Sequence, residues 1–175
     1  MRSASGGGID TSSPAIPLIA RERAPLLARP YLVGDEPSPL AGLMAHVPEL
    51  LEATMPFIAA IYGPTALAPR LKELVILRVS VRNGCRYCTR VHDDVAAEAG
   101  VSEGERRALH APETPLPLEG RERAAVLFAD AMCAVPGDAV ARLREFFRDD
   151  EIVELTMLAG ATIFLNRFCT ALGLR

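Results

Sequence analysis

Two cysteines and a histidine lie within eight positions of one another, in the stretch VRNGCRYCTRVHDD at residues 81–94. A helix turns by roughly 100° per residue, so the side chains of Cys85, Cys88 and His92 lie within about 60° on one face. His92 follows Cys88 by four residues and can hydrogen-bond its thiol. Cys85 follows Gly84 and begins a helix, where free backbone N–H groups favour a thiolate. Both thiols are therefore expected to ionise below the ordinary value of ~8.5, as redox or nucleophilic chemistry requires.

Glu73 is the acidic residue that can serve this cluster. It shares a helix face with apolar residues, and a buried carboxylate needs a partner. If the chain reverses near Gly84, position 73 returns antiparallel within about one turn of His92. Glu73 then orients the imidazole, while the imidazole draws a thiol proton. A simple ion pair of Glu73 with Lys72 or Arg78 is the alternative.

Four other side chains are assigned simpler roles. Tyr87, between the two cysteines, and Ser80, on the Glu73 face, are predicted to line a pocket. Cys133 and Cys169 have no second thiol or histidine nearby in sequence, so both are predicted to be core residues.

The sequence around these residues predicts helices throughout. Residues 1–39 are rich in proline and glycine and are predicted to be a flexible N-terminal arm. Residues 40–175 are predicted to form a compact all-α bundle of about six to eight helices. The segment LVILRVSV at 74–81 could also pass for a buried strand, but its neighbours offer no partner strand. The helices are expected over 39–63 (two short ones, or one kinked at Pro48 and Pro56), 69–84, 85–100, 102–109, 118–134, 139–147 and 149–172.

Composition excludes several classes of protein. The net charge is −3 and the basic residues are scattered, which argues against nucleic-acid binding. The longest weakly polar stretch, LTMLAGATIFL, is shorter than the roughly 18 residues of a membrane span, so no membrane partner is expected. The start of the chain lacks the apolar core of a signal peptide, which favours a cytoplasmic location with reduced cysteines. Because 50% of the residues are apolar, a homo-oligomer is expected.

The pattern Glu-x11-Cys-x-x-Cys-x3-His, formed by Glu73, Cys85, Cys88 and His92, resembles a known family. It is similar to alkylhydroperoxidase D and the thiol-bearing branch of the carboxymuconolactone decarboxylase superfamily. The likeness extends over about residues 40–174, through MAHVPELLEATMPFIAAIYG and EIVELTMLAGATIFLNRFCTALG. Alkylhydroperoxidase D has a histidine between its cysteines, where this chain has Tyr87.

The resemblance implies an all-helical protein that forms trimers, hexamers or related rings and reduces small hydroperoxides through a disulfide. It implies that Cys88 attacks the peroxide, that Cys85 resolves the disulfide, and that His92 and Glu73 relay protons. A dithiol or lipoyl-type reductant would then restore the thiols. From the residues alone the order of the thiols stays open, because the helix dipole favours Cys85 and the imidazole favours Cys88. The peroxidase reading requires no cofactor and no metal.

Two rival functions are compatible with the same residues. The first is a lyase related to carboxymuconolactone decarboxylase, whose activity in the family does not depend on a CxxC pair. The second is a non-enzymatic zinc site made by Cys85, Cys88, His92 and Glu73, although three ligands along one helix give awkward tetrahedral geometry. Haem attachment is excluded, because Thr89 stands where a histidine would have to follow the second cysteine.

Overall fold

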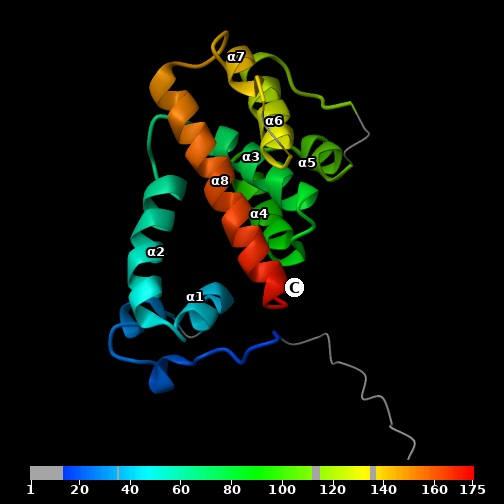
Figure 1. The fold of residues 1–175 in the computed structure, drawn as a ribbon. Coiled ribbons are helices and arrows are strands. Elements are labelled where there is room, and N and C mark those ends of the chain that lie inside the picture. The colour runs from blue at the N-terminus through cyan, green and yellow to red at the C-terminus, as the bar shows by residue number, and fades with distance from the viewer. Residues whose placement is uncertain (1–13, 35, 112–114, 135–136) are drawn as a thin grey trace, which may run out of the picture.

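The computed structural model describes residues 14–34, 36–111, 115–134 and 137–175. Over these ranges every regular element is a helix, which confirms the predicted all-α fold (Figure 1). The described residues form eight α-helices and two short 3-10 helices. They are η1 (Arg21–Arg23), η2 (Arg29–Tyr31), α1 (Pro39–Met44), α2 (Pro48–Tyr62), α3 (Pro69–Arg82), α4 (Arg86–Glu98), α5 (Glu103–His110), α6 (Gly120–Met132), α7 (Ala139–Leu143) and α8 (Asp149–Ala171).

Helix α3 is the centre of the bundle. It packs against α4, α5, α6 and α8, and every residue from 71 to 80 is buried. A helix enclosed on all sides has no polar face to keep, which explains why its sequence is β-branched and apolar without clear amphipathic spacing. The prediction of a helix over LVILRVSV is confirmed.

Helix α8 runs the length of the molecule, between α2 on one side and the α3–α6 layer on the other (Figure 1). Its most apolar window has a mean hydropathy of 1.4, so by length and composition it could cross a membrane, and half of that window is buried inside the protein. Three apolar side chains on its outer face remain exposed: Val153, Met157 and Phe164. They are the kind of surface that the predicted homo-oligomer would cover.

Two prolines act differently in the segment 39–63. The chain breaks at Pro48, which occupies the first turn of α2, so two helices form. Pro56 lies inside α2 and does not end it, contrary to one of the two expected breaks. Pro56 is exposed, so water can reach the carbonyl group that loses its hydrogen bond.

Two later helices differ from their predicted bounds. Helix α7 ends at Leu143 rather than continuing to 147. Arg148 rather than an aspartate precedes α8, and both Asp149 and Asp150 lie in its first turn. That position still suits acidic residues, because the N-terminal end of a helix carries partial positive charge.

The described part of the arm packs on the bundle. Ala24, Ala28 and Leu32 are buried against α1, α2 and Leu165 of α8. Ala15 donates its backbone N–H to the carbonyl of Leu172 over 2.9 Å. Residues 14–34 therefore cover the end of the bundle near Leu172, and residues 1–13 of the predicted arm lie outside the described residues.

Two buried basic side chains of α3 have their own partners. Lys72 Nζ lies 2.9 Å from Glu154 of α8 and donates to the carbonyls of Ile61 and Gly63. Arg78 makes two hydrogen bonds to Asp130 of α6, of 2.7 and 2.8 Å, and a third to the carbonyl of Leu109. These contacts satisfy charges that would otherwise be costly inside the bundle.

Replacing Arg78 by leucine should destabilise the fold strongly. The side chain of Arg78 is 4% exposed. Its loss leaves Asp130 with the more distant Arg82, 3.4 Å away, and removes the donor to the Leu109 carbonyl. We expect the free energy of unfolding in urea to fall by about 3 kcal/mol. Arg107→Leu is the matched control: its side chain is 75% exposed and lies 3.8 Å from Glu103, so the expected change is below about 0.5 kcal/mol. Equal losses in both variants would contradict this account of α3.

Candidate active site

The turn between α3 and α4 brings an acid and an imidazole together. Gly84, with a φ of 66°, occupies the left-handed region that other residues avoid, and α4 returns along α3. This places Glu73 Oε2 2.9 Å from His92 Nδ1. Glu73 is buried and His92 is partly buried. An ionised carboxylate can only accept, so Nδ1 donates and Nε2 is the ring nitrogen left free.

The alternative pairing of Glu73 with a basic neighbour on α3 does not occur. Lys72 is bound to Glu154, and Arg78 is bound to Asp130. Glu73 therefore pairs with the imidazole of His92, and its carboxylate fixes the orientation of the ring.

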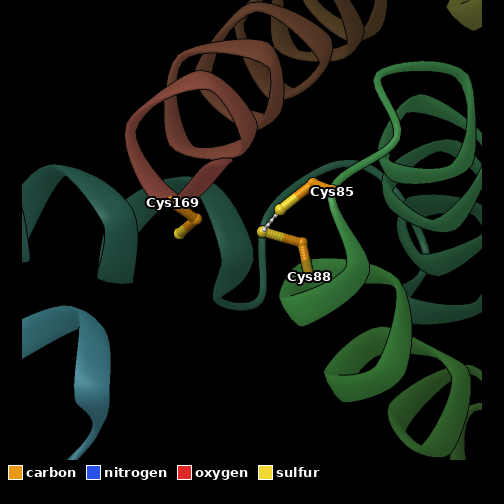
Figure 2. Close-up of side chains that lie close together, drawn as sticks. All are labelled: Cys85, Cys88 and Cys169. Atoms are coloured by element: carbon orange, nitrogen blue, oxygen red, sulfur yellow. Dashed lines mark hydrogen bonds between the residues drawn. The ribbon is translucent and has the colours of Figure 1, made fainter. Parts of the chain in front are cut away.

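The two cysteines of the CxxC motif lie at the beginning of α4. Cys85 is the N-cap residue and Cys88 lies in the first turn. Their sulfur atoms are 2.9 Å apart, within hydrogen-bonding distance, and both thiols are free (Figure 2). Cys85 is fully buried, whereas Cys88 retains 8% of its surface.

A third sulfur completes this cluster: Cys169 is buried in the core, as predicted, but it also lies beside the CxxC pair. The sulfur atoms of Cys85, Cys88 and Cys169 all lie within 4.8 Å of one another, and Figure 2 shows Cys169 approaching from α8. Leu43 and Leu174 pack around the cluster. Cys133, the fourth cysteine, lies elsewhere, with its sulfur 3.8 Å from the Asn83 amide nitrogen.

A small cavity reaches part of this cluster. Its volume is about 150 Å³, and both Cys88 and His92 line it. The predicted pocket residues Ser80 and Tyr87 also line it, whereas Cys85 and Glu73 lie behind its wall. The further lining residues are Ser38, Leu40, Tyr62, Val91, Thr162, Leu165, Asn166 and Cys169.

The hydrogen bond predicted between His92 and Cys88 does not form. Among the described residues, the His92 ring makes its hydrogen bond with Glu73. Cys88 and His92 instead share the wall of the cavity, so a molecule inside it can contact both.

Polar residues of the cavity wall come from helices that sequence reasoning did not connect with the motif. The Tyr62 hydroxyl lies 3.3 Å from Thr162 Oγ1, and the Tyr62 ring meets His92 edge-on at 5.8 Å between centroids. Asn166 Nδ2 donates to Ser80 Oγ over 3.2 Å. Burial raises the pKa of Tyr62 to about 12, so its hydroxyl keeps its proton at neutral pH.

The three thiols ionise unequally. Hydrogen bonds from the Cys169 and Cys88 thiols lower the pKa of Cys85 well below its ordinary value. The Cys169 thiol also favours a thiolate at Cys88, but the adjacent Cys85 and burial outweigh it and raise the pKa of Cys88 to about 11. Contacts with Cys85 and Cys88 raise the pKa of Cys169. These shifts favour a thiolate at Cys85 over a thiolate at Cys88 or Cys169.

The four residues of the predicted zinc site do not gather as one ligand set. Within the described ranges, the group whose ligand atoms come close enough consists of Cys85, Cys88 and Cys169. Glu73 and His92 lie outside this group and bind each other. The geometry thus separates an acid–imidazole pair from a sulfur cluster, with a cavity between His92 and Cys88.

The chain is similar in sequence to a known protein family and to curated proteins. The sequence profile of the carboxymuconolactone decarboxylase family matches residues 48–131. The uncharacterized protein Rv2313c of Mycobacterium tuberculosis is 36% identical over 104 residues. That match covers 57% of this chain and 37% of Rv2313c, so the chain corresponds to well under two thirds of that relative.

Three solved structures share the fold. ATU0492 of Agrobacterium tumefaciens, described as a putative antioxidant defence protein AhpD, is 29% identical with a TM-score of 0.68, covering 74% of this chain and 92% of its own. A peroxidase-related protein of Ralstonia eutropha with an alkylhydroperoxidase AhpD core is 18% identical with a TM-score of 0.82, covering 93% and 91%. The debrominase Bmp8 is 21% identical with a TM-score of 0.74, covering 94% and 91%.

The profile match, the helical fold and these neighbours agree with one another. The chain is similar to the carboxymuconolactone decarboxylase family over residues 48–131, and its fold is that of the alkylhydroperoxidase D-like proteins.

Proposed function

We propose that this protein is a thiol-dependent reductase of small hydroperoxides that cycles Cys85 and Cys88 between dithiol and disulfide. One observation carries the proposal: two free thiols lie 2.9 Å apart, and one of them shares a small cavity with a histidine held by a buried glutamate. A nucleophile, a second thiol and an oriented proton carrier are the parts that such a reaction needs.

In the resting state, the thiol that a substrate in the cavity can contact differs from the thiol that is more easily deprotonated. Cys88 lines the cavity, whereas the lowered pKa is that of the enclosed Cys85. The short contact between the sulfurs reconciles the two, because Cys88 can pass its proton to the Cys85 thiolate across 2.9 Å. Cys88 is then the thiolate that meets the substrate, which agrees with the order implied by the family resemblance.

The first chemical step oxidises Cys88. Its thiolate attacks one peroxide oxygen, a sulfur–oxygen bond forms, and the oxygen–oxygen bond breaks. Cys88 becomes a sulfenic acid, and the alkoxide that leaves takes a proton from the His92 imidazolium. The Glu73 carboxylate, hydrogen-bonded to Nδ1, stabilises that imidazolium before the transfer.

The second step closes the disulfide. Cys85, once deprotonated, attacks the sulfenic sulfur of Cys88 and displaces hydroxide, which is protonated to water. Overall the two thiols lose two electrons and two protons, and the hydroperoxide becomes an alcohol and water. A dithiol or lipoyl-type reductant, which we propose as the partner, returns the electrons by thiol–disulfide exchange at Cys88.

The other functions account for fewer of these features. A lyase of the decarboxylase type leaves the paired thiols without a role. A zinc site made from Glu73, His92 and both cysteines does not match how those groups are distributed. The debrominase Bmp8 shares the fold, and a variant of it has been solved in complex with 2,3,4-tribromopyrrole, a small brominated molecule. We favour hydroperoxides because the small cavity suits a compact substrate.

One equivalent of an organic hydroperoxide should convert the reduced protein to a species lighter by two hydrogens. Peptide mapping by mass spectrometry should locate the new disulfide at Cys85–Cys88. Cys88→Ser should abolish hydroperoxide consumption, because the thiol that lines the cavity is lost. Cys133→Ser, outside the sulfur cluster, is the control and should behave as wild type. An unchanged mass in the wild type, or full activity of Cys88→Ser, would refute the proposal.

The two thiols should titrate far apart. Because the pKa of Cys85 is lowered, its thiolate persists until the pH falls well below ~8.5. Because the pKa of Cys88 is raised to about 11, its thiolate appears only in strong alkali. The ultraviolet absorbance of thiolates should therefore show about one thiolate per chain near pH 7. A wild-type protein without thiolate absorbance at that pH would contradict the lowered pKa of Cys85.

A further inference from the structure

Cys169 lies in the site without a role in the proposed reaction. It belongs to the last turn of α8, two residues before the helix ends, and is almost fully buried. Its sulfur lies within 4.8 Å of both CxxC sulfurs. It also lines the same cavity as Cys88, whereas Cys85 does not.

This arrangement gives Cys88 thiol neighbours on two different helices. Cys85 contacts it at 2.9 Å from the start of α4, and the sulfur of Cys169, on α8, lies within 4.8 Å of it (Figure 2). A sulfenic acid on Cys88 would therefore form within reach of two thiols. A residue that only fills the core does not need to lie beside the reacting sulfur on the cavity wall.

We propose that Cys169 is a second resolving thiol, which captures oxidised Cys88 in a disulfide that joins α8 to α4. The inference rests on the proposed function. A disulfide requires a sulfur–sulfur distance of about 2.05 Å, so the two sulfurs must approach by less than about 3 Å. Rotation of the Cys169 side chain, together with a small shift of the final turn of α8, supplies a movement of that size.

The chemistry balances with the same oxidant. The hydroperoxide oxidises Cys88 to a sulfenic acid and leaves as an alcohol. The Cys169 thiol loses its proton and attacks the sulfenic sulfur, which releases water and forms the Cys88–Cys169 disulfide. Because the pKa of Cys169 is raised, this route is slower than capture by Cys85 and operates when Cys85 is unavailable.

The consequence is protection of Cys88 against overoxidation. A sulfenic acid without a thiol partner proceeds to sulfinic and sulfonic acids under excess peroxide. A Cys88–Cys169 disulfide would also occupy the wall of the cavity and exclude further hydroperoxide until the bond is reduced.

The test compares three variants treated with excess organic hydroperoxide: Cys85→Ser, Cys85→Ser/Cys169→Ala and Cys85→Ser/Cys133→Ala. We expect Cys85→Ser and the Cys133 control to lose two hydrogens and yield a Cys88–Cys169 peptide on mapping. The Cys169 variant should instead gain two or three oxygens on Cys88. Overoxidation of Cys88 at the same rate in all three variants would overturn the inference.

A second oxidant separates this inference from the proposed function. Diamide oxidises neighbouring thiols to a disulfide without a peroxide or a sulfenic acid. If diamide forms the Cys88–Cys169 disulfide in Cys85→Ser while hydroperoxide oxidises none of the variants, the sulfur pairing stands and the peroxidase proposal fails. If diamide forms no such bond in folded Cys85→Ser, as judged by its unchanged circular dichroism, the pairing itself is refuted.

Discussion

The buried carboxylate of Glu73 is the constraint on which the site depends. A carboxylate inside a helical bundle must find a partner within the protein, because desolvation otherwise makes its charge prohibitive. The basic neighbours on α3 are engaged elsewhere, Lys72 with Glu154 and Arg78 with Asp130. The turn at Gly84 then presents His92 at 2.9 Å. One backbone reversal thus satisfies a buried charge, orients an imidazole and positions the CxxC pair at the beginning of α4.

In the sulfur cluster, the thiol with the lowered pKa is not the thiol that lines the cavity. Cys85 carries the preferred thiolate and is enclosed, whereas Cys88 is protonated at rest and lines the cavity. The contact of 2.9 Å lets one proton exchange between them, so a reactive thiolate reaches the cavity only when Cys88 gives up its proton. The same arrangement leaves Cys85 well suited to the resolving step, since the attacking sulfur there must also be a thiolate.

Sequence reasoning reached the parts of the site that local geometry determines. The spacing of Cys85, Cys88 and His92 is helical, and α4 places all three as that period requires. The proximity of Glu73 to His92 was predicted from a single chain reversal near Gly84. The helix predicted over 102–109 likewise forms as α5, and the side chains of Ser102 and Glu105 make reciprocal hydrogen bonds at its start.

The remaining parts depend on packing between helices distant in the chain. Cys169 and Asn166 reach the site because of how α8 lies across α3 and α4, and Tyr62 reaches it from α2. The periodicity of residues within a helix does not indicate which other helix will pack against its buried face. The His92–Cys88 hydrogen bond was predicted from an i, i+4 relation alone, but Glu73 holds the ring and leaves Cys88 to the cavity.

The most direct test of the central claim is a double-mutant cycle on the rate constant for hydroperoxide reduction, using Glu73→Gln, His92→Asn and the double variant. If Glu73 acts through His92, each single change slows the reaction by about 100-fold, and the double variant is no slower than His92→Asn. Asp93→Asn and His110→Asn provide a matched control, because that acid–imidazole pair is also 2.9 Å apart but lies away from the sulfurs. Effects of Glu73 and His92 that multiply, or a loss of rate no larger than in the control pair, would contradict the account.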